Sequence, residues 1–246
     1  MFEDAVPKIK LGGLLPLPII DNAAYEFYRL APPGVMSVMI PVGLSEFSAK
    51  DVERVFAPLD NYLDQLFERG VHLVAQHGVP LPILIGVEAH DRMVAHMAKH
   101  TGLPASSTVL AVARGTRDLG VRKLVVVNKW NDSMNASLAE FFAREGVTVT
   151  GKTVEELSPA EFVKLSTRDN MKLAYELGCK AFDDHPDCDA IYIGGGAWLS
   201  EPVAKELEQQ YGKPVVCNQT AMIRDQLKTL KAWTPRQGFS RLLGLA

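Results

Sequence analysis

One stretch constrains the fold more than any other: residues 189–199 run DAIYIGGGAWL, an apolar segment that ends abruptly in Gly194, Gly195 and Gly196. A segment with helical spacing, 201–210, follows directly. This order is typical of a buried parallel strand, a glycine turn and a helix N-terminus. Free backbone N–H groups at such a turn can bind a carboxylate or a phosphate. Tight packing of strand against helix also calls for glycine, so both interpretations stay open at this point.

Apolar runs of strand length alternate with helical patterns along the whole chain. The predicted strands cover about 10–17, 35–42, 71–75, 122–128, 147–152, 189–193 and 214–217. The predicted helices cover about 21–30, 48–70, 86–100, 109–119, 131–144, 158–183, 201–210 and 221–231. This alternation predicts an α/β fold in which parallel sheets are covered by helices on both faces.

The two halves of the sequence resemble each other. Gly102-Leu103-Pro104 precedes a Ser/Thr segment in the first half, and Gly212-Lys213-Pro214 stands in the same place in the second. We therefore expect two similar Rossmann-like lobes related by an internal duplication, 1–120 and 121–246, with the last helix and C-terminal segment packing back on the first. Ligands bind at the carboxyl ends of parallel strands, so an active-site cleft should lie between the lobes. The loops expected to converge there are 16–18, 76–80, 105–108, 128–132, 194–198 and 217–220.

Composition excludes several classes of function. Of the 246 residues, 47% are hydrophobic and 22% charged, and the formal net charge of −3 favours neither nucleic acid nor an anionic membrane as partner. No apolar run is long enough to span a membrane, and the N-terminus lacks the features of a signal peptide. The three cysteines are odd in number and lack metal-ligand spacing, which indicates free thiols and a cytoplasmic location.

The segment from Thr101 to Leu124, TGLPASST followed by LGVRKL, is the most telling for family resemblance. It resembles the aspartate/glutamate/hydantoin racemase superfamily, most closely its arylmalonate decarboxylase and maleate isomerase branch. The glycine triplet and Gly212-Lys213-Pro214 match in place and spacing. The resemblance implies proton transfer at a carbon next to a carboxylate, with neither metal nor organic cofactor. It implies a small carboxylic acid as substrate and allows a homo-oligomer.

The same resemblance shows what this chain lacks. Racemases of the superfamily use two cysteines, one per lobe, and the decarboxylases keep only the second. The first would fall at Gly78 and the second at Gly194, and both positions are glycine here. The thiol chemistry of the family therefore cannot run unchanged in this chain.

Two other residues are the candidates for acid–base chemistry. His77 follows a strand directly before Gly78, and imidazole exchanges protons near neutral pH. Cys217 lies at a strand end in the second half, where nearby N–H groups could ionise a thiol, although cysteine is often simply buried. No arginine or lysine falls at the centre of the loops except Lys129, whose placement there stays open.

By the resemblance, backbone N–H groups and hydroxyls at the loop tips hold the substrate carboxylate and stabilise an enediolate. The residues expected to bind substrate are Pro16, Gly78, Val79, Ser106, Ser107, Thr108, Trp130, Gly194, Gly195, Gly196, Asn218 and Thr220. His96 and His100 lie four apart on one predicted helix with no third ligand in view, so we expect a solvated face there and no metal site.

Three functions stay open. The first is a cofactor-independent carbon-acid enzyme, in which His77, with or without Cys217, replaces the thiols. A racemase needs an acid and a base on opposite faces of the substrate, and Gly194 offers no side chain on the second face. This favours a decarboxylase-like lyase over an isomerase or racemase. The second is a metal-assisted lyase or hydrolase that uses His77 with Cys217 or a carboxylate. The third is a non-catalytic protein that binds a small acid in the cleft.

Overall fold

The computed structural model describes residues 5–19, 21–162, 164–195 and 198–246. The first half contains β1 (Ile9–Leu15), α1 (Asn22–Leu30), β2 (Val35–Pro41), α2 (Ala49–Phe56), α3 (Leu59–Glu68), β3 (Leu73–Gln76), α4 (Pro80–Ile85), α5 (Val87–Thr101), β4 (Ala105–Ser107) and α6 (Thr108–Asp118). The second half contains β5 (Lys123–Asn128), α7 (Asp132–Arg144), β6 (Thr148–Val154), α8 (Pro159–Phe162), α9 (Thr167–Asp184), β7 (Ala190–Ile193), α10 (Glu201–Tyr211), β8 (Val215–Cys217), α11 (Asn218–Thr229) and α12 (Arg241–Gly244).

The strands form two parallel sheets with the same topology. The order is β2-β1-β3-β4 in the first and β6-β5-β7-β8 in the second, so each strand of one half has a counterpart in the other. The helices that precede β4 and β8 both end in a left-handed glycine, Gly102 with φ 68° and Gly212 with φ 68°. Only glycine adopts this conformation readily, so the shared Gly-x-Pro segments have a common structural cause. The predicted α/β fold of two similar lobes is confirmed.

Prolines and caps set the helix boundaries. The prediction of one helix over 48–70 is wrong: Pro58 separates α2 from α3, because proline has no N–H to give to the preceding turn. The helix expected over 86–100 is preceded by the separate short helix α4, which Gly86 (φ 78°) ends. The segment expected to be helical over 158–183 is divided into α8 and α9, and the Ser166 side chain caps α9 by accepting the Asp169 N–H.

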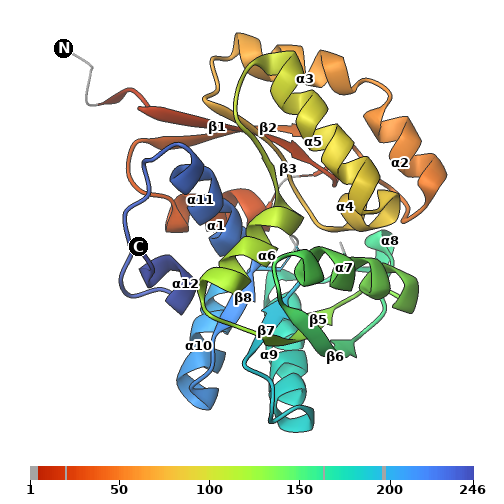
Figure 1. The fold of residues 1–246 in the computed structure, drawn as a ribbon, viewed down its shortest axis with the longest axis vertical. Helices are drawn as coiled ribbons and strands as arrows, with labels where there is room; N and C mark the ends of the chain where they lie inside the picture. The colour runs from red at the N-terminus through yellow and green to blue at the C-terminus, as the bar shows by residue number, and fades with distance from the viewer. Residues whose placement is uncertain (1–4, 20, 163, 196–197) are drawn as a thin grey trace.

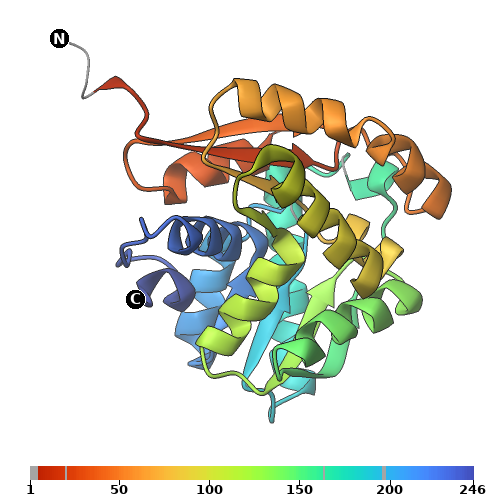
Figure 2. The ribbon, with the colours of Figure 1, turned by 45° about the horizontal axis from the view of Figure 1, so that its top comes forward.

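Two helices connect the halves. Helix α6 packs along α11, and the two lie side by side between the sheets in both ribbon views (Figures 1 and 2). Helix α6 also contacts α7 and β8 of the second half, whereas α11 contacts α1 and β4 of the first. One hydrophobic core cluster accordingly contains residues of both sheets, among them Leu11, Ala75, Val126 and Tyr192. We retain 1–120 and 121–246 as a proposed division of the chain.

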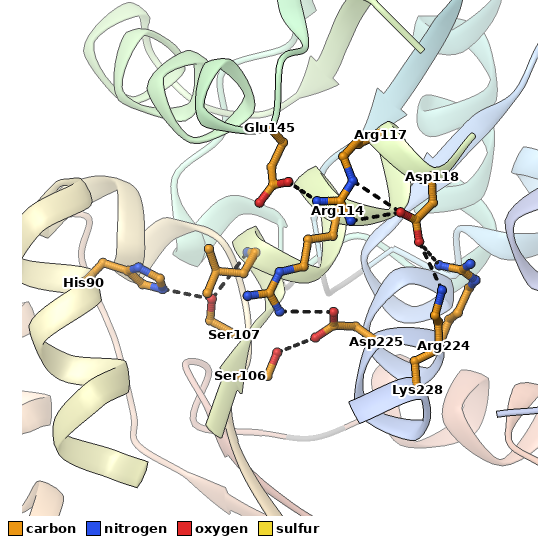
Figure 3. Close-up of polar contacts among 11 residues, drawn as sticks. His90, Ser106, Ser107, Arg114, Arg117, Asp118, Glu145, Arg224, Asp225 and Lys228 are labelled. Atoms are coloured by element: carbon orange, nitrogen blue, oxygen red, sulfur yellow. Dashed lines mark hydrogen bonds and ion pairs between the residues drawn. The ribbon is translucent and has the colours of Figure 1, made fainter. Parts of the chain in front are cut away.

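An ion-pair network ties α6 to α11 (Figure 3). Asp118 accepts hydrogen bonds from Arg224 Nη1 at 2.7 Å and Arg117 Nη2 at 2.9 Å, and Lys228 Nζ lies 3.4 Å away. Burial alone would raise the pKa of Asp118, but the hydrogen bonds from Arg224 and Arg117 outweigh it and the pKa is lowered. The Arg224 side chain is only 5% exposed, so it depends on Asp118 for charge compensation.

In the described part of the chain, no helix combines the length and the apolar character needed to cross a membrane.

The network predicts a difference between two aspartates. Asp118→Ala should lower the free energy of unfolding by about 2–4 kcal/mol, because it leaves a nearly buried arginine without its carboxylate. Asp184→Ala is the matched control: its pair with Lys180 is exposed, so the change should stay within about 0.5 kcal/mol. Urea denaturation of both variants measures the difference, and equal losses would contradict the role of Asp118.

Candidate active site

A predominantly apolar pocket lies between the halves, at the carboxyl ends of strands from both sheets. Its lining comes from each loop cluster expected to converge, together with residues that follow β1 and β2. It comprises Leu15, Pro16, Leu17, Ile19, Asp21, Ala23, Leu44, Phe47, His77, Gly78, Pro80, Thr108, Lys129, Trp130, Gly194, Gly195, Asn218 and Gln219. The parallel topology produces this convergence, because every strand of a sheet ends at the same edge.

Neither Gly78 nor Gly194 has room for a side chain. A Cβ on Gly78 would lie 2.6 Å from the Pro16 ring, and its φ of +78° is unfavourable for other residues. A Cβ on Gly194 would lie 2.9 Å from the Trp130 ring and 3.0 Å from the Tyr192 hydroxyl. The two positions expected to correspond to the cysteines of the superfamily are therefore closely packed by neighbouring side chains.

Lys129 places a cationic group at the wall of this pocket. It follows β5, and its side chain is 4% exposed. Its Nζ lies 4.2 Å from the centre of the Trp198 ring and 3.5 Å from Asn170 Oδ1. It also lies 3.9 Å from the position a Cβ on Gly195 would take. Burial lowers the pKa of Lys129 to about 6, so the amine exchanges protons near neutral pH.

His77 lines the same pocket from the first half. Its ring fills the space left by Gly13 of β1: its Nε2 lies 2.6 Å from the position a Cβ there would take. This Nε2 is covered and has no hydrogen-bond partner within the described residues. Burial lowers the pKa of His77 to about 4, so the imidazole is neutral at pH 7. It is thus poorly suited to donate a proton through Nε2.

Asn218 presents a fixed amide to the pocket. Burial raises the pKa of Tyr192 well above its ordinary value, so its hydroxyl stays protonated and donates to Asn218 Oδ1 at 2.6 Å. The Nδ2 of Asn218 is buried and has no partner among the residues the structure describes. An unsatisfied buried donor costs about 1–3 kcal/mol, which a bound oxygen would recover.

Most of the predicted hydroxyl groups are committed elsewhere. Ser106 donates to Asp225 at 2.5 Å, and the Ser107 hydroxyl lies 2.8 Å from His90 Nε2 (Figure 3). Thr220 donates to the Cys217 carbonyl at 3.0 Å. Thr108 does line the pocket, where its hydroxyl accepts the Gly78 N–H at 2.8 Å. These hydrogen bonds hold the loops in place. Of the predicted serine and threonine residues, only Thr108 lines the pocket.

Of three further predicted residues, two have side chains in the core and one lies outside the described part of the chain. Cys217 belongs to the core cluster of the second half, its thiol donates to the Ser200 carbonyl at 3.6 Å, and burial raises its pKa well above the ordinary value. It is absent from the pocket lining because its side chain points to the same face of β8 as Val215, a core residue. Val79 is buried in the cluster shared by the halves. Gly196 lies outside the described residues.

The metal-site hypothesis for the pocket paired His77 with Cys217 or with a carboxylate. Of the first pair, His77 lines the pocket, whereas Cys217 lies in the core of the second half. Among the described residues, the His, Cys, Asp and Glu side chains close enough to share an ion are Asp60, His96 and His100, which are exposed and do not line the pocket.

The structure adds residues that the sequence analysis missed. Tyr192 was taken only as part of a strand, yet its hydroxyl orients Asn218. Gln219 lines the pocket and donates from Nε2 to the Ala23 carbonyl at 2.7 Å. Phe47 and Leu44 close the pocket from the loop after β2. The available signal was position alone, since Gln219 lies directly after β8, in the first turn of α11.

Comparison with known proteins gives a consistent result. The family model for arylmalonate decarboxylase matches residues 30–243. Arylmalonate decarboxylase of Bordetella bronchiseptica is 26% identical over 211 residues, 85% of this chain and 87% of that protein. A crystal structure of arylmalonate decarboxylase superposes with a TM-score of 0.79 at 25% identity, covering 95% of this chain and 98% of that one. Maleate isomerase Iso from Pseudomonas putida S16 shares the fold, with a TM-score of 0.80 at 19% identity over 96% of this chain and 98% of that one. The predicted resemblance is confirmed.

The space around Gly78 predicts a sharp response to one methyl group. Gly78→Ala should lower the free energy of unfolding by about 2–4 kcal/mol, the sum of left-handed strain and overpacking against Pro16. Gly102→Ala is the matched control, since its φ of 68° is also left-handed but nothing lies within 4 Å of its Cβ position. It should cost only about 1–2 kcal/mol. Denaturant titration compares them, and equal costs would show that Pro16 does not close the position.

The burial of Lys129 predicts a pH-dependent cost. The unfolded chain holds a proton on this amine up to its ordinary pKa of 10.5, whereas the folded chain loses it above about pH 6. Its contribution to stability should therefore rise with pH between these values. At pH 6–7, Lys129→Met should raise the free energy of unfolding by about 1–4 kcal/mol and remove that slope.

The matched control is Lys123→Met, at the exposed start of the same strand, which should change stability by less than about 0.5 kcal/mol. Thermal and urea unfolding at several pH values provide the measurement. A loss of stability in Lys129→Met would show that the lysine serves the fold and not the pocket.

Proposed function

The chain belongs to the arylmalonate decarboxylase family, and from this membership we propose that it is a cofactor-independent carbon-acid enzyme, a decarboxylase-like lyase that acts on a small carboxylic acid. The observation that carries the proposal is the Lys129 amine in an apolar pocket, beside Gly195, the residue that follows the expected thiol position. A buried amine with a lowered pKa attracts a carboxylate and can transfer a proton near neutral pH.

The proposed reaction begins with an ion pair. The protonated Lys129 holds one carboxylate of the substrate, whose charge favours the ammonium form. The bond from carbon to the second carboxylate then breaks, carbon dioxide leaves, and the electron pair remains on the substrate as an enediolate. Lys129 Nζ–H delivers a proton to the carbon, and the resulting neutral amine regains a proton from solvent. Atoms and charges balance without a cofactor.

Asn218 supports this reaction as a hydrogen-bond donor. Asn218 lines the pocket, its buried Nδ2 has no protein partner among the described residues, and the Tyr192 hydroxyl fixes the amide. A donor held in place before charge develops lowers the barrier by about 3–4 kcal/mol in comparable sites. Asn218 thus takes the part of the enediolate-stabilising group, and Tyr192 is a positioning residue.

One observation favours an isomerase or racemase as the alternative. His77 and Lys129 reach the pocket from opposite halves, and both have pKa values below the ordinary range. An acid and a base on opposite faces are what a two-base isomerase needs. In that case His77 would accept the proton that Lys129 replaces on the other face.

The remaining expectations stay proposals. The substrate is a small carboxylic acid, the location is cytoplasmic, and no nucleic acid or membrane partner is involved. A homo-oligomer is compatible with this function. If the protein binds small acids but does not turn them over, it is a binding protein with the same fold.

The proposal predicts unequal effects of three substitutions. Lys129→Met and Asn218→Ala should each lower kcat about 10²–10³-fold on any disubstituted malonic acid that the enzyme decarboxylates. Cys217→Ser should leave kcat within a few-fold, because the thiol lies in the core. Carbon dioxide release and proton NMR in D₂O measure turnover and show deuterium at the reacting carbon.

Each result has a distinct meaning. Deuterium exchange without loss of carbon dioxide would favour the isomerase or racemase. Loss of activity in Cys217→Ser with Lys129→Met still active would contradict the assignment of the acid. Absence of turnover over a broad panel of acids, with affinity that depends on Lys129, would indicate a binding protein.

A further inference from the structure

Two adjacent helices of the first half present matched pairs of polar side chains. Asp60 and Asp64 lie one turn apart on α3, and His96 and His100 lie one turn apart on α5. The two helices contact each other and run side by side over the first sheet (Figure 1). Their apolar faces carry Leu63, Leu66, Met93 and Met97 into the core. The four polar side chains lie on the outer side of the contact.

The distances between these side chains are short. His96 Nε2 lies 2.6 Å from Asp60 Oδ1, and His100 Nε2 lies 2.8 Å from Asp64 Oδ1. His100 Nδ1 also lies 3.8 Å from Asp60 Oδ1. Ligand atoms of Asp60, His96 and His100 all lie within 4.8 Å of one another. Three donors from two helices therefore lie close together, and Asp64 lies beside one of them.

The donor set matches one class of ion. Two imidazoles with one or two carboxylates suit Zn²⁺ and its first-row neighbours, whereas Mg²⁺ prefers an all-oxygen shell. The carboxylates also offset the charge of the metal ion.

We propose that Asp60, His96 and His100, with Asp64 as a fourth ligand, form a zinc-type metal site that joins α3 to α5 on the surface of the first lobe. The site is separate from the pocket, since none of its residues lines it. A tetrahedral Zn²⁺ needs ligand atoms about 3.3–3.4 Å apart. The side chains are 26–63% exposed, so they can rotate to this spacing without moving the helices.

The test is isothermal titration of the full-length protein, freed of metal with a chelator, with ZnCl₂. We expect one Zn²⁺ per chain and a rise in melting temperature when Zn²⁺ is present. His96→Ala and His100→Ala should each weaken binding at least 10-fold, and Asp60→Asn should weaken it several-fold. Melting temperatures without metal should stay close to the parent value, because these side chains are exposed. MgCl₂ should produce neither binding heat nor stabilisation.

Two controls separate this site from other metal-binding groups. His185→Ala removes a histidine on another surface, and Cys179→Ser removes a half-buried thiol. Both should bind Zn²⁺ like the parent. Unchanged Zn²⁺ affinity in the His96→Ala/His100→Ala double variant would overturn the proposal, as would absence of Zn²⁺ binding or equal binding of Mg²⁺. The proposal does not depend on the function of the pocket, so a failure here leaves the proposed reaction untouched.

Discussion

The close packing around Gly78 and Gly194 determines what chemistry the pocket can hold. The Pro16 ring stands where a side chain at Gly78 would begin, and Trp130 and Tyr192 do the same at Gly194. The two positions expected to correspond to the thiols of the superfamily are thus closely packed by neighbouring side chains. Reactive groups have to come from adjacent positions on the same strand ends, and the duplicated parallel sheets bring His77, Lys129 and Asn218 there.

Lys129 is the group whose burial has the largest consequence. An ammonium group that is 4% exposed in an apolar pocket lowers the stability of the fold. Proteins retain such a destabilising residue where function requires it. The aromatic face of Trp198 and the side-chain oxygen of Asn170 partly stabilise the charged amine, yet the pKa of Lys129 still falls to about 6. A carboxylate entering the pocket restores the charged form. In the proposed reaction, the same burial that weakens the fold prepares the amine for binding an acid and moving a proton.

Sequence patterns predicted the parts of the structure that depend on local geometry. The α/β alternation, the glycines that end α5 and α10, and the convergence of strand-exit loops all follow from short-range rules. Contacts made over long separations in the chain were beyond reach: Ser106 meets Asp225, 119 residues away, and so leaves the pocket. The face of β8 to which the Cys217 side chain points depends on the register of the strand. A shift of one residue would turn that side chain to the opposite face. The position of the Lys129 side chain could not be predicted from the neighbouring sequence, because it lies beside Asn170, which is 41 residues further along the chain.

The most direct test of the central claim is the pKa of the Lys129 ε-amine, measured by NMR on protein labelled in its lysine side chains, with Lys129→Met used to assign the signal. The account predicts a pKa near 6 in the free protein. It also predicts a rise when a small carboxylic acid is added, because the bound carboxylate favours the ammonium. A pKa near the ordinary 10.5 that does not respond to such an acid would contradict it.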